Sequence, residues 1–90
     1  MYELKRRPTT PGEVLREEFL EPMGLTQAQL AERMGVPLQR VNTIITGRRA
    51  VTAETALLLA RVLKTSPEFW MNLQSAVDLW DARQKLKRAG

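Results

Sequence analysis

Neither cysteine nor histidine occurs among the 90 residues of the sequence. Without cysteine the chain can form no disulfide, and without both residue types it lacks the ligands that hold most zinc ions in proteins. Histidine is also the commonest general base in enzymes. The ten carboxylates are scattered, and the five glycines are too dispersed to form a phosphate-binding loop. We therefore predict no enzymatic activity, metal site, cofactor or small-molecule ligand.

Long apolar runs are absent as well. Even the apolar stretch at residues 56–60 is flanked by Glu54 and Arg61, far short of the roughly 20 apolar residues that a membrane-spanning helix needs. No stretch has the pattern of a signal peptide. We expect a cytoplasmic protein without a membrane partner. We also expect a single domain of residues 1–90, because a chain of this length can bury only one modest core.

The charge balance is basic, with 14 Lys and Arg residues, ten Asp and Glu residues and a formal net charge of +4. Such an excess favours a polyanionic partner, but the distribution of the charges is more informative than their sum. Residues 12–32 carry five Glu and one Arg, so this part of the surface should face away from a nucleic acid. Residues 37–52 carry three Arg and no acidic residue, and they are the expected phosphate-binding segment.

The most specific pattern lies at residues 25–52, where two short amphipathic helices are separated by Gly35 and followed by a basic loop. Thr26 is placed to cap a helix that begins at Gln27, and Gln29 completes a capping box. Gly35 supplies the left-handed residue that ends this helix. The apolar face of the helix consists of Leu30, Ala31 and Met34.

A second helix follows directly. Pro37 fits its first position, and Gly47 ends it. Its apolar stripe consists of Val41, Ile44 and Ile45. Two such helices joined by a tight turn form a helix-turn-helix, here at about residues 26–46, whose second helix enters the major groove of DNA.

The outward face of this second helix carries side chains that match base edges. Gln or Asn can bind adenine through two hydrogen bonds, Arg can bind guanine in the same way, and Thr offers a hydroxyl and a methyl group. The candidate base-reading residues are Gln39, Arg40 and Thr43, followed by Asn42 and Leu38. The candidate phosphate-binding residues are Thr26, Gln27, Arg48 and Arg49. Taken singly, these residues are also typical of a solvated helix, but their order along the chain favours DNA binding.

Three further helices complete the expected all-α fold of five helices. Thr10 and Glu13 form a capping box at the start of the first helix, which ends at residues 22–24. Thr52 caps the fourth helix, which ends at about Lys64. We expect only the two ends of the chain to fray, at residues 1–9 and after Gln84.

The last helix, at about residues 66–88, is capped by Ser66 and begins at Pro67. Its first apolar residues, Phe69, Trp70 and Leu73, are assigned mainly to the core. Val77, Leu79 and Trp80 either extend this core or contact a second copy of the chain, a kind of site where Trp is enriched. Because a helix-turn-helix of this size binds weakly alone, we expect a homodimer whose reading helices lie about 34 Å apart on a palindromic operator.

The C-terminal half also carries a resemblance to a known family. Residues 66–70 read Ser-Pro-Glu-Phe-Trp, residues 72–74 read Asn-Leu-Gln and residues 78–80 read Asp-Leu-Trp. Together with Leu-Thr-Gln at 25–27 and Gly-Arg-Arg at 47–49, these segments make the chain similar to HigA-type antitoxins. These antitoxins form a VapI-like branch of the phage-repressor (XRE) helix-turn-helix family.

The resemblance implies a lambda-repressor-like domain that binds double-stranded operator DNA as a homodimer and represses its own operon. It also implies a HigB-like partner, a RelE-like toxin that cleaves mRNA and is neutralised by direct binding. Two alternatives stay open: an orphan XRE-family regulator without a toxin, and a protein-interaction module that no longer binds DNA. Relatives often have a capping Ser where this chain has Pro37, and a polar residue where it has Leu38.

Overall fold

The computed structural model describes residues 6–89 of the protein. In chain order the elements are α1 (Pro11–Val14), the π-helical segment η1 (Leu15–Leu20), α2 (Glu21–Met23), α3 (Gln27–Met34), α4 (Leu38–Ile45), α5 (Ala53–Leu63) and α6 (Pro67–Ala89). Because α1, η1 and α2 follow one another without a break, they form one continuous helix. The predicted all-α fold of five helices is therefore confirmed over the described residues.

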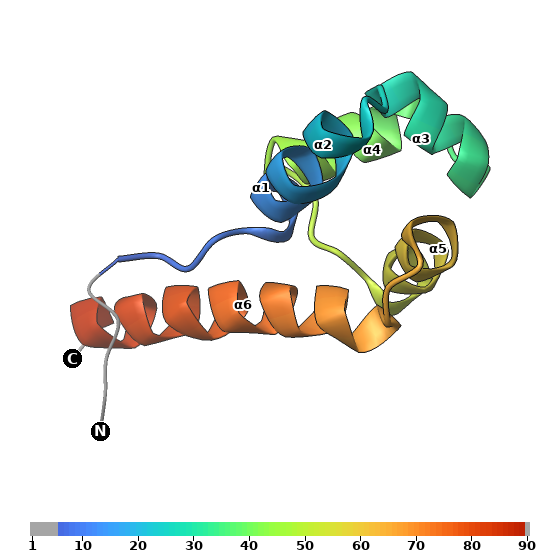
Figure 1. The fold of residues 1–90 in the computed structure, drawn as a ribbon. Coiled ribbons are helices and arrows are strands. Elements are labelled where there is room, and N and C mark those ends of the chain that lie inside the picture. Colours follow the sequence, from blue (N-terminus) through green and yellow to red (C-terminus); the bar gives the residue numbers. More distant parts are fainter. Residues whose placement is uncertain (1–5, 90) are drawn as a thin grey trace.

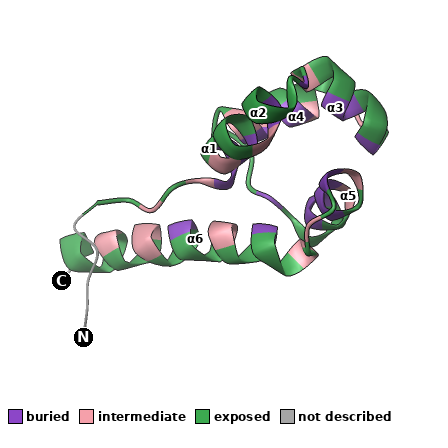
Figure 2. Ribbon diagram, in the orientation of Figure 1, coloured by how far each residue is buried: buried purple, intermediate pink, exposed green. Residues whose placement is uncertain are grey.

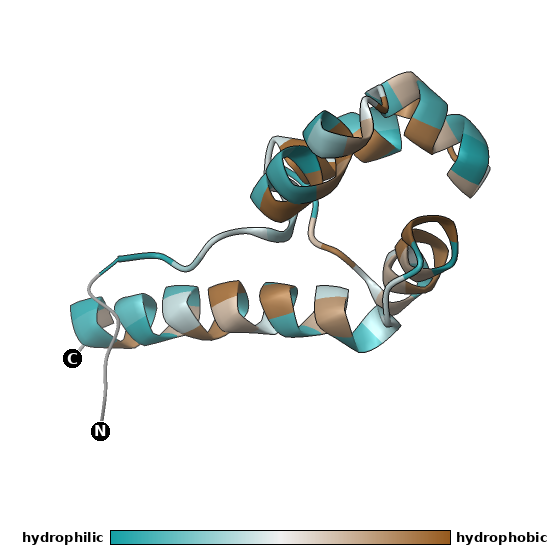
Figure 3. Cartoon of the chain, in the orientation of Figure 1, coloured by the Kyte–Doolittle hydropathy of each residue, from teal (hydrophilic) through white to brown (hydrophobic). Residues whose placement is uncertain are grey.

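The helices form two groups, as Figure 1 shows. The first group contains α1 to α4, and in the second α5 packs against the N-terminal end of the long helix α6. Buried and hydrophobic residues of both groups face the region between them (Figures 2 and 3). The core residues that are most completely enclosed include Leu15, Leu30, Leu59 and Trp70. In the described part of the chain, no helix is long and apolar enough to cross a membrane.

Local hydrogen bonds fix the starts of the helices. Glu13 N–H donates to Thr10 Oγ1 at 3.1 Å and Thr10 N–H donates to Glu13 Oε1 at 3.0 Å, which is the predicted capping box. Thr26 and Gln29 form the same reciprocal pair at 3.1 and 2.9 Å. The bond from the Thr10 backbone is the main cause that lowers the pKa of Glu13. Charged Glu13 therefore adds stability near neutral pH, which is lost as the pH falls through its lowered pKa.

The first helix ends within residues 22–24, the range that the sequence indicates. It passes through Pro22 and ends at Met23, with Gly24 in the left-handed conformation at φ 61°. The π-helical segment explains how a proline fits, because Glu21 N–H donates to Arg16 O, five residues back, and the turn is wider there. In a regular α-helix the ring of Pro22 would clash with the carbonyl of residue 18.

The start of α4 also differs from the prediction. Pro37 is the N-cap and not the first helical residue, since its ψ of 148° is extended and the helix begins at Leu38. The fixed φ of proline is compatible with this extended conformation as well as with a helix. At the other end, the helix stops at Ile45, and Gly47 follows in the left-handed region at φ 80°.

The last helix, α6, continues to Ala89, one residue beyond its predicted end at about residue 88. Lys87 and Arg88 in its last turn carry the charge that the negative end of the helix dipole favours. Arg7, within the N-terminal segment that we expect to fray, forms two hydrogen bonds to Asp81 of α6 at 3.0 and 2.9 Å. Residues 1–5 of the arm lie outside the described residues.

Gly12 allows α1 to approach the end of α4 very closely. A Cβ atom at this position would lie 2.2 Å from Ile44 O, 2.7 Å from Ile45 O and 2.8 Å from Ile45 Cα. All three are backbone atoms, which cannot turn away as a side chain could. The backbone conformation of Gly12 itself is ordinary, so the constraint at this position is one of space and not of φ.

We predict that Gly12→Ala destabilises the protein by about 1–3 kcal/mol, the usual cost of adding a methylene-sized group to a packed core. The sign is diagnostic, because in a helix with free space the same change stabilises by about 0.5–1 kcal/mol. Urea unfolding followed by circular dichroism measures the difference. An unchanged or higher free energy of unfolding would contradict the close approach.

Candidate DNA-binding interface

The core holds α4 along one face and leaves the opposite face open. Val41 and Ile44 are buried, whereas Leu38, Gln39 and Asn42 are exposed. This outward face is the one that the spacing of the apolar residues predicts. A side chain on it can reach a partner without disturbing the core.

The three leading base-reading candidates lie together. A groove of about 320 Å³ on this side of the molecule is lined by Pro37, Gln39, Arg40, Thr43 and Arg49. The structure therefore joins one phosphate-binding candidate, Arg49, to Gln39, Arg40 and Thr43. An amide, a guanidinium and a hydroxyl are in this way presented at one place on the surface.

Two of the outward residues are already engaged. The hydroxyl of Thr43 donates to the carbonyl of its own helix at Gln39, at 2.9 Å, or at Arg40, at 3.1 Å. Its oxygen lone pairs and its methyl group remain for a base. Asn42 Nδ2 donates to Gln27 Oε1 at 3.2 Å, so the first residue of α3 is tied to the middle of α4. This bond links a base-reading candidate to a phosphate-binding candidate.

Arg40 contacts a residue that is not among the candidates predicted from the sequence. Its Nη1 lies 3.6 Å from Glu54 Oε1 in the first turn of α5. The Arg40 side chain is 25% exposed and that of Glu54 is 78% exposed. No local sequence pattern indicates this pair, because the two residues are on different helices and are separated by the basic loop.

The basic loop folds back onto α4. The backbone N–H groups of Arg48 and Arg49 both donate to Thr43 O, at 2.9 and 3.0 Å. The two arginine residues themselves are exposed. Their backbone is therefore fixed relative to the groove, while the guanidinium groups stay free to meet phosphate oxygens.

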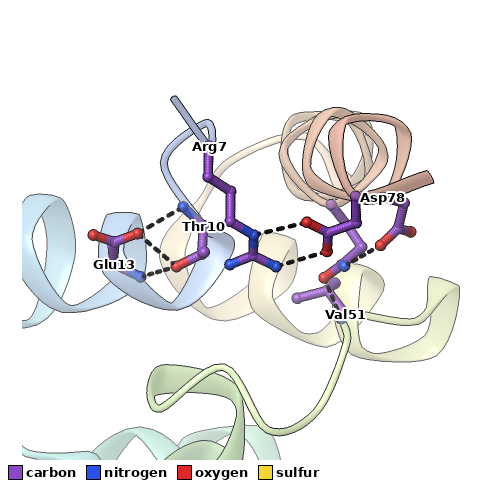
Figure 4. A network of polar contacts seen from close by, with 7 residues as sticks. Arg7, Thr10, Glu13, Val51 and Asp78 are labelled. Carbon is purple, nitrogen blue, oxygen red and sulfur yellow. Dashed lines mark hydrogen bonds and ion pairs between the residues drawn. The ribbon is translucent and has the colours of Figure 1, made fainter. Parts of the chain in front are cut away.

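A polar network anchors the far end of this loop, as Figure 4 shows. Val51 N–H donates to Gln74 Oε1 at 2.8 Å, and Gln74 Nε2 donates to Asp78 Oδ1 at 2.9 Å. One helical turn further, Asp81 binds Arg7, and this hydrogen bond is the main cause that lowers the pKa of Asp81 and raises that of Arg7. The network ties both the loop and the N-terminal arm to α6.

The three candidates for a dimer contact differ in accessibility. Val77 is only 3% exposed within the single chain, so it offers a partner almost no surface, and we assign it to the core instead. Leu79 is 51% exposed. Trp80 is half-buried, and its indole Nε1 has no hydrogen-bond partner among the described residues.

Comparison with known proteins places this arrangement in a family. Residues 17–70 match the Helix-turn-helix family model. Antitoxin HigA-1 of Vibrio cholerae serotype O1 is 52% identical over 85 residues, which covers 94% of this chain and 80% of that protein. The chain belongs to the HigA antitoxin family. This family comprises antitoxins and helix-turn-helix regulators and not enzymes, in agreement with the sequence analysis.

Two solved structures relate the HigA fold to DNA. The Pseudomonas aeruginosa antitoxin HigA with the higBA promoter has a TM-score of 0.87 and 40% identity, and the match covers 92% of this chain and 90% of that one. The antitoxin GraA in complex with its operator has a TM-score of 0.87 and 45% identity, with coverage of 99% and 90%. Both matches cover nearly the whole of this chain.

We predict that Arg49→Ala lowers the slope of log binding constant against log salt by about one, because one phosphate contact and its released counterion are lost. Titration of duplex DNA at several salt concentrations measures this slope. Arg61→Ala, which removes an exposed arginine near the other end of α5, is the matched control and should leave the slope unchanged. Equal slopes for Arg49→Ala and the unmodified protein would exclude Arg49 from the phosphate-binding residues.

Proposed function

We propose that this HigA-family protein binds operator DNA through α4 and represses its own operon. The observation that carries the proposal is the single groove that contains Gln39, Arg40 and Thr43 together with Arg49. Side chains that distinguish bases and a side chain that binds phosphate are both needed for sequence-specific binding. The similar structures of HigA with a promoter and of GraA with its operator support the assignment.

The phosphate contacts are expected at two places, the loop after α4 and the start of α3. Arg48 and Arg49 follow α4, and Thr26 and Gln27 begin α3, where backbone N–H groups and the positive end of the helix dipole favour an anion. Because Asn42 is bonded to Gln27, a phosphate held at the start of α3 would also fix the position of α4. Contacts to the backbone would set the docking, while α4 reads the bases.

We infer that the protein acts as a homodimer on a palindromic operator, with α6 in the contact. Leu79 and Leu86 are both strongly exposed and lie two turns apart on this helix, so they share a face. Trp80 lies beside Leu79 and is half-buried, although its indole Nε1 is enclosed within the single chain. An apolar stripe with an adjacent half-buried Trp has the composition of a protein interface.

We further infer that the partner outside DNA is a HigB-like toxin that this protein neutralises by direct binding. The support is the family name carried by Antitoxin HigA-1. An orphan regulator would use the same DNA-binding groove without a toxin. The gene neighbourhood distinguishes the two, because a small adjacent reading frame for a basic protein favours the antitoxin.

DNA reading is tested by titrating the purified protein into its own upstream DNA and into a scrambled duplex of equal length, with fluorescence anisotropy as the readout. We expect tighter binding to the upstream DNA at both low and physiological salt, because base contacts depend on salt far less than phosphate contacts. Equal affinities that disappear together at physiological salt would show that only basic attraction is present. That result would favour the protein-interaction module.

The dimer is tested by sedimentation of Leu79→Glu at micromolar concentration. We expect the unmodified chain to sediment as a dimer and the variant as a monomer, because a buried unpaired charge is strongly unfavourable. Leu57→Glu is the matched control, since Leu57 on α5 is 59% exposed and should tolerate the change. A dimeric Leu79→Glu variant would exclude this part of α6 from the contact.

A further inference from the structure

We propose that Glu54 is a specificity-determining residue that positions the guanidinium of Arg40 for guanine. The inference rests on the proposed DNA binding through α4, and it adds a residue that lies outside the helix-turn-helix. Glu54 is on α5, beyond the basic loop, yet its carboxylate is the ion-pair partner of a leading base-reading candidate. A carboxylate at this place needs an explanation, because DNA repels it.

The geometry places Arg40 between two elements. Its side chain lines the groove with Gln39 and Thr43, and its Nη1 reaches Glu54 Oε1 at 3.6 Å. The Arg40 side chain is only 25% exposed, although α4 turns its outer face to solvent. Arg40 therefore has a restricted orientation before any DNA is bound, whereas Gln39 beside it is exposed.

A restricted arginine reads a base better than a free one. A long side chain loses conformational entropy when a base contact immobilises it, and a chain that is already held loses less. The planar guanidinium must also meet the two acceptors of guanine in a defined orientation. An ion pair to one Nη atom limits the orientations available and leaves the remaining N–H groups free to donate to the base.

The charge of Glu54 has a second, separate effect. Residues 37–52 carry three Arg and no acidic residue, and Glu54 is the first carboxylate after them. Beside this basic segment a negative charge weakens binding to any phosphate backbone, whatever the base sequence. Specificity is a difference between affinities, so this common penalty lowers affinity for all DNA, and only the positioning of Arg40 changes the preference for one base.

The proposed positioning of Arg40 must be distinguished from a simpler role of Glu54, the stabilisation of the start of α5. An acidic residue in the first turn of a helix is favoured by the helix dipole, and α5 begins one residue earlier, at Ala53. Glu68 occupies the same place in α6, directly after Pro67, and makes it possible to measure that role alone. Glu54→Asp separates the roles further, because it keeps the charge at the start of α5 but shortens the side chain by one methylene.

The experiment compares five proteins with the unmodified chain: Glu54→Gln, Glu54→Asp, Glu68→Gln, Arg40→Ala and the double variant Arg40→Ala/Glu54→Gln. Anisotropy at one fixed salt concentration gives their affinities for the upstream DNA, for a scrambled duplex and for operators with each base pair replaced in turn. Thermal unfolding of each variant confirms that it is folded at the temperature of the titrations.

We expect Arg40→Ala to abolish discrimination at one base pair. Glu54→Gln and Glu54→Asp should each lower discrimination at that same base pair by about two- to fivefold, the range of an exposed ion pair. Glu54→Gln should also bind the scrambled duplex more tightly. Glu68→Gln should change neither quantity, and the double variant should discriminate no worse than Arg40→Ala.

Four results would overturn the inference. Unchanged discrimination in Glu54→Asp would mean that only the charge of Glu54 matters. A loss spread equally over all base pairs, or one that adds to that of Arg40→Ala, would mean that Glu54 acts independently of Arg40. If Arg40→Ala alters no base preference while the upstream DNA is still preferred, the inference fails and the proposed DNA binding stands.

Discussion

The backbone of α1 lies directly against the last turn of α4 at Gly12, and the position of α4, the proposed reading helix, depends on this contact. Two helix backbones can come so close only where one of them lacks a side chain. The buried side chains of Val41 and Ile44 and the bond from Asn42 to Gln27 also hold α4 in place. Because α4 is fixed in this way, its outward side chains occupy defined positions on the surface of the protein.

Much of the fold could be predicted from the sequence because its signals are local. A capping box such as that of Thr26 and Gln29 is contained in four residues. A glycine that adopts the left-handed conformation after a helix is also a signal from one position in the sequence. The exception is Pro37, because it fits an N-cap as well as a first helical position. Pro22 is tolerated in the first helix because a π-helical turn precedes it. The last helix ends at Ala89, close to the end that its residues indicate.

The candidate interface was predictable to a similar degree. The helical period alone shows which face of α4 is apolar, so Gln39, Arg40 and Thr43 could be assigned to the outward face. Their grouping with Arg49 and the pairing of Arg40 with Glu54 depend on how the loop folds back, which no short pattern encodes. The role of Val77 could not be assigned for a related reason, since a stripe on a helix does not show whether the same chain or another covers it.

Through the network around Gln74, α6 connects the loop after α4 to the proposed dimer contact at Leu79. Gln74 holds the loop that follows α4, and Leu79 projects from the same rigid helix five positions later, about 7.5 Å along its axis. A helix bends little over such a distance. In the proposed dimer, a second copy seated on Leu79 would be held at a nearly constant offset from α4, so movement within one subunit could not absorb the insertion of a single base pair at the centre of a palindromic operator.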